Sequence, residues 1–399
     1  MRSPVVSERQ VSEVAIQAAR ARDLLAALVQ KATIRVDARC YWGQWLDNAR
    51  QHDQKGVYGT TAAVELLVEN GVAADQELVK SALDGLPVSG SGDRYKADDA
   101  DLVFKVAAIV QACGKARGPL EQTHPAVLRL IAMRADERGW GGYSSLSTSD
   151  TAPALVPTAV ALLALAHTPE WGVDQRCRPT LVWLSERLAA GSTDEVGDAL
   201  GLLALQAYRS VGMEIPEWQQ GTRAARVRII ATLKTQTGTP QVRSYHYPVD
   251  LGEPKNEYMY FSPAIVGALA LLSGQPGRRI PGGPQVVRLV RTVAAMVVRD
   301  GAFRHDGRVA TVDQLWVDRL LHAFGIAARS PTLLLQPVAS GLFGDKRRWF
   351  TVPAMLALAV AAGFLASGNK VGIIQVLGGV ASGLILNVIA NQFGARGPD

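Results

Sequence analysis

DERGWGGYSSLSTSDTAPALVPTAVALLALA, residues 136–166, combines a turn, a polar loop and an apolar helix in one short stretch. The acidic turn contains a glycine and is followed at once by Trp140. A loop rich in Ser and Thr comes next, and from Thr158 the residues are small and apolar without a polar stripe. A helix that is apolar on all sides is normally buried on all sides. The stretch therefore predicts a helix packed inside a larger helical assembly.

The same order of features recurs along the chain. An acidic, glycine-containing turn with Tyr58 precedes the apolar run at 60–67, and a turn with Phe303 precedes the run at 311–316. Strand signals are scarce, and a period of about 40 to 60 residues with paired helices is typical of a repeat protein. Small apolar helices alternating with charged ones predict an all-α fold in two concentric layers, with the apolar set inside. Weaker apolar copies begin near Asp99, Asp198 and Pro263, and amphipathic helices fall at 125–134, 179–188, 222–234 and 285–299.

Residues 136–166 resemble the repeat of the terpenoid cyclase and protein prenyltransferase superfamily, which includes squalene-hopene cyclase-like proteins. The resemblance implies an α/α toroid of about six helix pairs around a central cavity. It covers roughly residues 35–330 and is most specific at Trp140 and the helix that follows.

Two sites resemble the Asp-x-Asp-Asp motif with which class II cyclases of that superfamily protonate an alkene. In the better match, Asp99 and Asp101 occupy the first two aspartate positions and Asp101 would be the proton donor, but Leu102 replaces the last aspartate. The second match keeps only the last aspartate, Asp150. Aspartates at a helix start also cap free backbone N–H groups, which is the alternative reading of both sites.

Aromatic residues are the candidates for a cavity lining. Cyclases use aromatic faces to stabilise carbocations, yet Phe, Trp and Tyr make up only 6% of this chain, which counts against a multi-ring cyclase. The alternative for each aromatic side chain is ordinary core packing. The candidates are Trp140, Tyr143, Tyr245, His246, Tyr258 and Tyr260.

No cofactor and no metal ion is expected from the sequence. Cys40, Cys113 and Cys177 lack the His and Asp neighbours of a zinc site, and their odd number fits a reducing cytoplasm better than a disulfide framework. Asp318 and His322 share a helical face, and a surface or core pair is the preferred reading over an acid–base dyad. A net charge of +6 without a basic stripe excludes nucleic acid as a partner.

The C-terminal region contains two apolar runs, 349–366 and 371–390, each long enough to cross a bilayer as a helix. The basic residues at 346–348 favour a cytoplasmic start, so a hairpin over 349–392 would return to the inner face of the membrane. Buried core helices are the alternative. The remaining segments are a preceding interfacial linker, 331–348, and an N-terminal amphipathic helix, 1–34. Gly379 and Gly383 have the spacing of a close helix–helix contact, either within the hairpin or between the chains of a homo-oligomer.

Two functions fit these features. The favoured one is a membrane-anchored toroid, both termini cytoplasmic, that senses a partner or an isoprenoid or other apolar ligand. Its two-helix module would contact membrane lipid and transmit the response or perturb the bilayer. The alternative is an isoprenoid cyclase with Asp101 as the acid. The incomplete aspartate motif favours the function without catalysis and leaves the enzyme as the alternative.

Overall fold

The computed structural model describes residues 6–37, 39–47, 56–73, 76–86, 103–141, 153–166, 168, 175–191, 194–213, 215, 218–250, 254–274 and 279–335, with only the backbone of 244–250 and 254–260. The chain divides into two compact units, Met1–Leu335 and Gln336–Asp399. The second unit, with the predicted hairpin, the end of the linker, Gly379 and Gly383, lies outside the described residues. Among those that are described, no helix is both long and apolar enough to cross a membrane.

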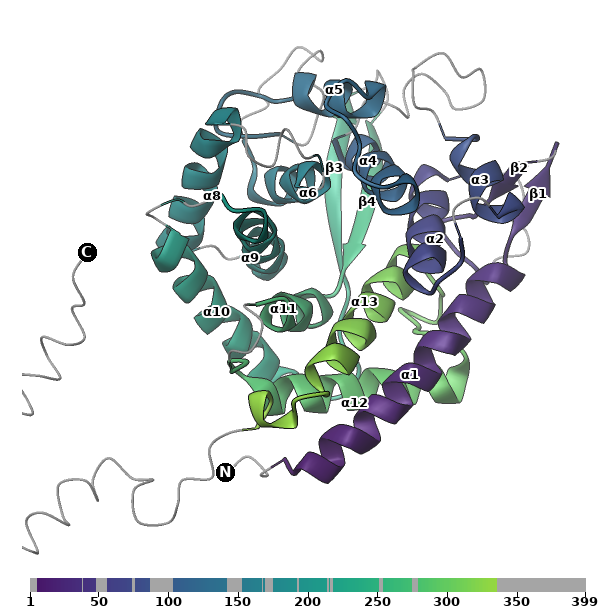
Figure 1. The fold of residues 1–399 in the computed structure, drawn as a ribbon, viewed down its shortest axis with the longest axis vertical. Coiled ribbons are helices and arrows are strands. Elements are labelled where there is room, and N and C mark those ends of the chain that lie inside the picture. Colours follow the sequence, from purple (N-terminus) through teal and green to yellow (C-terminus); the bar gives the residue numbers. More distant parts are fainter. Residues whose placement is uncertain are drawn as a thin grey trace, which may run out of the picture. The chain divides into compact units, whose positions relative to one another are not determined.

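Six inner helices form a closed ring in the described part of the first unit (Figure 1). Each helix packs against the next, and the last returns to the first. Most of their residues are buried, as expected for helices that are apolar all round. In order around the ring they are α2 (Val57–Glu69), α4 (Val103–Arg117), α6 (Leu155–Leu165), α9 (Glu195–Ser210), α11 (Pro263–Leu272) and α13 (Thr311–Ala327).

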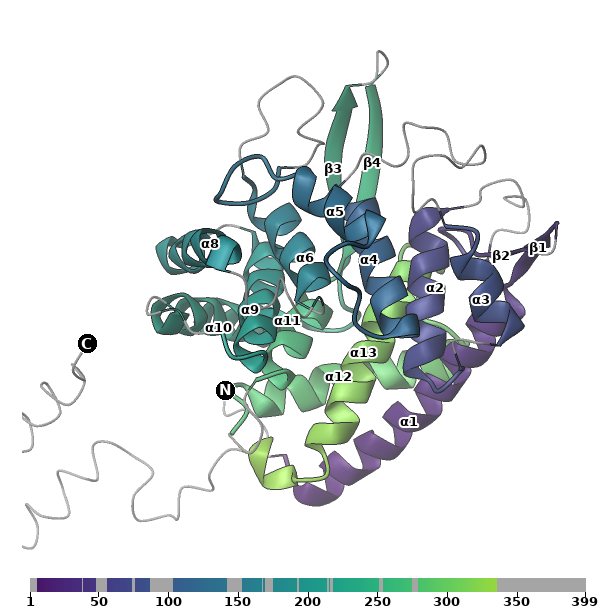
Figure 2. The ribbon, with the colours of Figure 1, turned by 45° about the horizontal axis from the view of Figure 1, so that its top comes forward.

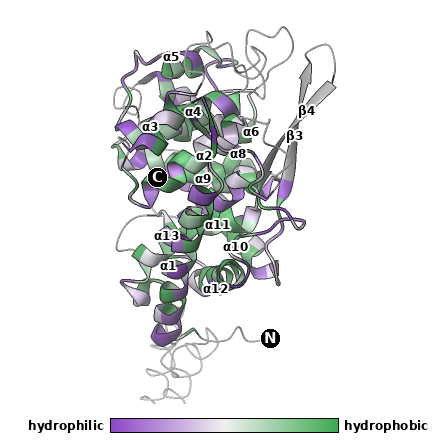
Figure 3. Ribbon diagram, turned by 90° about the vertical axis from the view of Figure 1, so that its right-hand side faces the viewer, coloured by the Kyte–Doolittle hydropathy of each residue, from purple (hydrophilic) through white to green (hydrophobic). Residues whose placement is uncertain are grey.

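Amphipathic helices cover the outside of the ring. Figure 3 shows the difference, because α11 is hydrophobic along its length whereas α1 mixes hydrophilic and hydrophobic residues. The predicted all-α class is confirmed. The outer helices are α1 (Glu8–Lys31), α5 (Pro125–Ala132), α8 (Arg178–Ala190), α10 (Trp218–Thr235) and α12 (Gly283–Asp300); a short α3 (Glu77–Leu83) packs on α2, and two 3-10 turns are η2 (Gln175–Cys177) and η3 (Pro331–Leu333).

Helix α1 belongs to the same compact unit as the ring. Ser7 caps its first turn through a reciprocal pair of hydrogen bonds with Gln10. Its buried residues recur every three or four positions from Val11 to Val29, and this stripe packs on α12 and α13. The N-terminal amphipathic helix predicted as a segment of its own is therefore an outer helix of the ring.

The same tryptophan–threonine contact occurs in two of the sequence repeats. The hydroxyl of Thr158 accepts from the Trp140 backbone N–H at 3.0 Å and donates to the Trp140 carbonyl at 3.1 Å. Thr60 and Trp42, also 18 residues apart, make the same two bonds at 3.2 and 3.4 Å. Each indole also donates to the last turns of the preceding outer helix, at 2.7 Å. In the first repeat, Trp42 therefore takes the position that Trp140 takes in the other. Tyr58 instead lies in the first turn of the inner helix α2.

The first and last sequence repeats meet and close the ring. Thr311 donates through its hydroxyl to the Gly43 carbonyl at 2.7 Å, and the Leu46 backbone N–H donates to the Val309 carbonyl at 2.8 Å. Gly59 packs on the same turn so closely that a Cβ there would lie 2.1 Å from the Gly43 oxygen. Only glycine fits at this contact.

Two antiparallel hairpins interrupt the helices. The first pairs β1 (Ile34–Val36) with β2 (Arg39–Tyr41), and the second pairs β3 (Arg243–Asp250) with β4 (Pro254–Phe261). The second hairpin follows α10 and precedes α11 in the chain, and Figure 2 shows it reaching beyond the ends of the helices. The sequence prediction missed it, although Tyr245, Tyr247 and Val249 alternate with other residues in the period of a strand.

Candidate ligand-binding site

A cavity occupies the centre of the ring. Its inner part measures about 50 Å³ and its outer part about 560 Å³. The two parts share the walls formed by Glu65, Gln111, Leu163, Trp316 and Arg319. Every lining residue comes from an inner helix except Phe261, the last residue of β4, and Ser273, which follows α11. The outer part lies in the range of 300–1,000 Å³ that small-molecule sites occupy.

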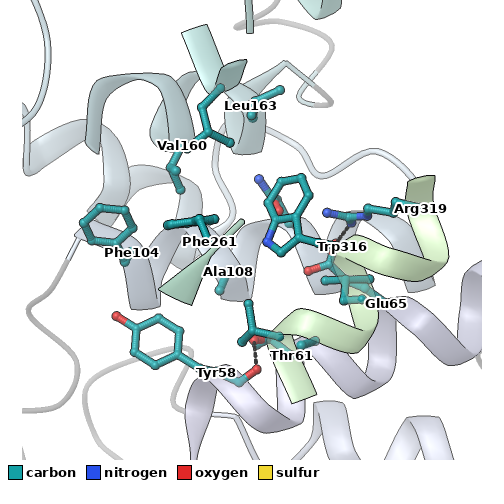
Figure 4. Close-up of a pocket in the computed structure, with 15 residues that line it drawn as sticks. Tyr58, Thr61, Glu65, Phe104, Ala108, Val160, Leu163, Phe261, Trp316 and Arg319 are labelled. Atoms are coloured by element: carbon teal, nitrogen blue, oxygen red, sulfur yellow. Dashed lines mark hydrogen bonds and ion pairs between the residues drawn. The ribbon is translucent and has the colours of Figure 1, made fainter. Parts of the chain in front are cut away.

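The inner part of the cavity is mainly apolar and aromatic. Tyr58, Phe104, Phe261 and Trp316 face it together with aliphatic side chains from α6, α9 and α13 (Figure 4). The Phe261 and Trp316 rings meet edge to face, with centroids 5.9 Å apart. Such a surface gains free energy by excluding water and accepts an apolar group of a ligand.

Charged side chains stand where the two parts of the cavity meet. Arg319 of α13 pairs with Glu65 and, at 3.2 Å, with Glu69, both of α2 (Figure 4 shows the pair with Glu65). Lys115 of α4 reaches Glu69 at 3.3 Å. The Glu65 side chain is 3% exposed and that of Arg319 15% exposed, and the guanidinium lies 5.4 Å from the Trp316 ring centroid. Three inner helices are thus joined by ion pairs inside an otherwise apolar wall.

Burial acts differently on the two carboxyl groups. It raises the pKa of Glu65 above the ordinary value, and the attraction of Arg319 only partly opposes this. Burial also disfavours the charge of Glu69, but Arg319 and Lys115 together outweigh it and lower the pKa of Glu69. Burial opposes the charge of Arg319 as well, yet the two glutamates raise its pKa. The site is therefore a buried cation held by two carboxyl groups of unequal acidity.

The outer part of the cavity has a polar rim at the C-terminal ends of the inner helices. Gln206 of α9 has both amide atoms buried and hydrogen-bonded to no described group, which is costly unless a ligand or water occupies the adjacent space. His322 also lines this part, and burial lowers its pKa. Asp318 does not pair with His322. It is fully buried and bonds Arg22 of α1 at 2.9 Å, so it joins the two helical layers.

The aromatic candidates from the sequence lie elsewhere or beyond description. Trp140 is fully buried between α5 and α6, and it lines neither part of the central cavity. Tyr245, His246, Tyr258 and Tyr260 fall on the β3–β4 hairpin, whose register pairs His246 with Tyr258, and only their backbone is described. The candidates Tyr143, Asp99, Asp101 and Asp150 lie outside the described residues.

Asp313 is an acidic group in the first turn of the inner helix α13. Asp313 is 4% exposed, and burial raises its pKa to about 7. Its Oδ2 atom lies 4.0 Å from Nδ1 of His305. The Asp313 side chain does not line the central cavity. It therefore contributes to the pH dependence of folding rather than to this site.

Metal chemistry has no candidate among the described residues, where no three His, Cys, Asp or Glu side chains gather as an ion would require. The three cysteines are buried and form no disulfide with a described residue, and burial raises the pKa of Cys113 to about 11. The Cys113 thiol is therefore protonated at neutral pH and is not a reactive thiolate.

The charged residues of the cavity were not predicted from the sequence. Their signal is visible in retrospect. Glu65 and Glu69 are charged residues, four positions apart, in the otherwise apolar helix α2, and Arg319 is a charged residue among apolar neighbours in α13. A charge in a helix that is otherwise apolar on all sides must be paired or face a cavity.

No protein-family model, curated protein or solved structure gives a significant match to the chain. The likeness to terpenoid cyclases and prenyltransferases thus rests on the repeat motif alone.

Proposed function

We propose that the chain is a ligand-sensing protein whose helical ring binds a small apolar ligand, such as an isoprenoid, in its central cavity. The observation that carries this proposal is the cavity itself, enclosed by inner helices, apolar within and polar at its rim. A ligand with one polar end would bury its apolar part against Phe261 and Trp316. Its polar end would meet the Arg319 cluster or the Gln206 amide.

The proposal includes the two-helix module predicted for 349–392 as the part that responds. A toroid tethered to the cytoplasmic face of the inner membrane would sample ligands that partition into lipid. Binding without catalysis is preferred, because the acids that face the described cavity are Glu65 and Glu69, and both are held by Arg319. A strong acid aimed at a bound alkene would need to be free of such a cation.

The test uses the full chain and farnesol, a neutral isoprenoid alcohol, as the probe. The chain should sediment with membranes and, after gentle extraction in detergent, bind farnesol saturably in native mass spectrometry. Ala108 is partly exposed because it faces the cavity, so Ala108→Trp should fill the space and reduce binding at least tenfold. Ala19→Trp, at an exposed position of α1, is the matched control and should bind as the wild type does.

Equal binding by both tryptophan variants would refute the cavity as the site. Recovery of the chain from cells without detergent would refute the membrane part of the proposal. Conversion of farnesol or a longer isoprenoid to a cyclic product that is lost in Asp101→Asn would instead establish the enzyme.

A further inference from the structure

A second pocket, of about 570 Å³, lies beside the central cavity and has a different character. Its charged lining consists of Arg209, Arg226, Arg279 and Arg329, and among the described residues that line it there is no carboxylate. Its floor is apolar and includes Ile280. We propose that this arginine pocket binds the phosphate group of an anionic ligand.

Three of the four arginines lack a counter-charge within the described part of the chain. Arg209 stacks on the Trp218 ring at 5.1 Å, and Arg279 donates to the Leu335 carbonyl at 2.5 Å. Arg329 is exposed and makes no ion pair with a described residue. Neutral contacts of this kind orient a guanidinium but leave its charge uncompensated. An arginine held in this way is prepared to bind an oxyanion.

The arginines that support the fold behave differently. Arg22 pairs with Asp318 at 2.9 Å, and Arg228 forms a bidentate ion pair with Asp198, with both hydrogen bonds at 2.7 Å. Arg319 is held between Glu65 and Glu69. Each of these three has a carboxylate on a neighbouring helix, whereas the described lining of the arginine pocket offers none.

Helix ends near the pocket do not neutralise it. Helices α9, α11 and α13 end beside it, and each C-terminus supplies roughly half a negative charge. Helix α12 begins beside it at Gly283 and supplies roughly half a positive charge. The guanidinium groups of Arg209, Arg279 and Arg329 therefore leave about two uncompensated positive charges. A phosphate monoester carries about −1.5 to −2 at neutral pH and is the oxyanion that fits such a pocket.

The phosphate could belong to a soluble metabolite or to a lipid headgroup. Leu272, Ala323 and Ile326 line both the arginine pocket and the central cavity, so an apolar chain attached to the phosphate can continue over a shared wall. The inference concerns a site of its own and does not require the central cavity to be filled.

The experiment measures binding of two probes to the full chain in a neutral detergent. Inorganic phosphate and phosphatidic acid are titrated separately, and the rise in unfolding temperature gives the apparent affinity. Saturable binding of either probe is expected at constant ionic strength. Phosphate without phosphatidic acid would identify a soluble source, and tighter binding of phosphatidic acid would identify a lipid. Binding of neither probe would overturn the proposal.

Variants decide whether the arginine pocket is responsible. Arg209→Gln/Arg329→Gln should weaken binding at least tenfold, because two charge-assisted contacts are lost. Arg223→Gln/Arg291→Gln removes the same charge from exposed positions of α10 and α12 outside the pocket and should leave the affinity unchanged. Equal losses in both double variants would show nonspecific attraction and overturn the proposal, as would no loss in the first.

If the Arg209 change disturbs folding, Arg329→Gln alone replaces the double variant, and its affinity for the phosphate probe should fall at least threefold. Farnesol binding should be the same in all these variants, so failure of the arginine pocket and failure of the central cavity are separate results.

Discussion

Arg319→Met is expected to destabilise the chain strongly and in a pH-dependent way. The change keeps much of the side-chain volume over Trp316 but leaves Glu65, whose side chain is 3% exposed, without its cation. Glu69 keeps Lys115 at 3.3 Å, so Glu65 is the group that must respond. Removing one partner of a buried ion pair typically costs about 3–5 kcal/mol.

The ionisation of Glu65 gives an independent figure. To stay folded, the variant can hold Glu65 protonated, and with an unfolded-state pKa of 4.5 this costs about 3.4 kcal/mol at pH 7 and about 0.7 kcal/mol at pH 5. A carboxyl group whose folded-state pKa is raised stabilises the fold below its unfolded pKa and loses that contribution as the pH rises. Because the pKa of Glu65 is raised in the wild type too, part of this pH dependence is shared, and Arg319→Met should be less damaging at pH 5 than at pH 7 by up to about 2.7 kcal/mol.

Urea unfolding of the full chain in neutral detergent, followed by far-ultraviolet circular dichroism at both pH values, measures these differences. Glu65→Leu/Arg319→Met should recover most of the loss, since neither charge then remains buried. Arg9→Met, in an exposed pair with Glu13, is the matched control and should change stability by no more than about 0.5 kcal/mol. A loss below about 1 kcal/mol at pH 7, or the same loss at both pH values, would refute the reasoning.

Two further predictions concern the scaffold. Thr158→Val leaves the buried Trp140 N–H without its acceptor and should cost about 1–3 kcal/mol in urea unfolding, with Thr60→Val in the same range and the exposed Thr235→Val near zero. Unequal results for Thr158 and Thr60 would contradict the equivalence of the two repeats. Asp313, with its pKa raised from 3.8 to about 7, loses its contribution to stability as the pH rises between these values, so Asp313→Asn should be up to about 4 kcal/mol more stable than wild type at pH 8 and close to it at pH 4. A wild-type stability that is flat from pH 4 to pH 8 would contradict the burial of this carboxyl group beside His305.

The layering of the fold was predictable because burial leaves a direct trace in the sequence. Inner helices such as α6 and α11 are apolar on every side, and outer helices such as α1 carry one apolar stripe. The repeat aromatic was predictable at Trp140, where turn, tryptophan and helix follow closely. In the first repeat the sequence prediction chose Tyr58 instead of Trp42. Trp42 is recognised by its hydrogen bond to Thr60, and that contact depends on how the turn folds back on the helix.

The candidate site was not predictable in the same way. Sequence reasoning placed the chemistry at helix starts, where Asp99, Asp101 and Asp150 follow a motif. The described polar groups of the cavity instead lie further along their helices, at Glu65 and Arg319, and these two are 254 residues apart. Their contact depends on closure of the ring between α13 and α2, which no local pattern in one sequence reveals.

The buried charges themselves favour binding over a purely structural role. Burying Glu65, Glu69 and Arg319 costs desolvation free energy that their mutual attraction barely offsets, and apolar residues of similar volume often stabilise a fold better. The scaffold already has its interlayer ties in Arg22–Asp318 and Arg228–Asp198, which lie away from the central cavity. A polar cluster facing an apolar cavity is useful mainly to something inside it, so Glu65→Leu/Arg319→Met should fold well and yet lose its preference for ligands with a polar end.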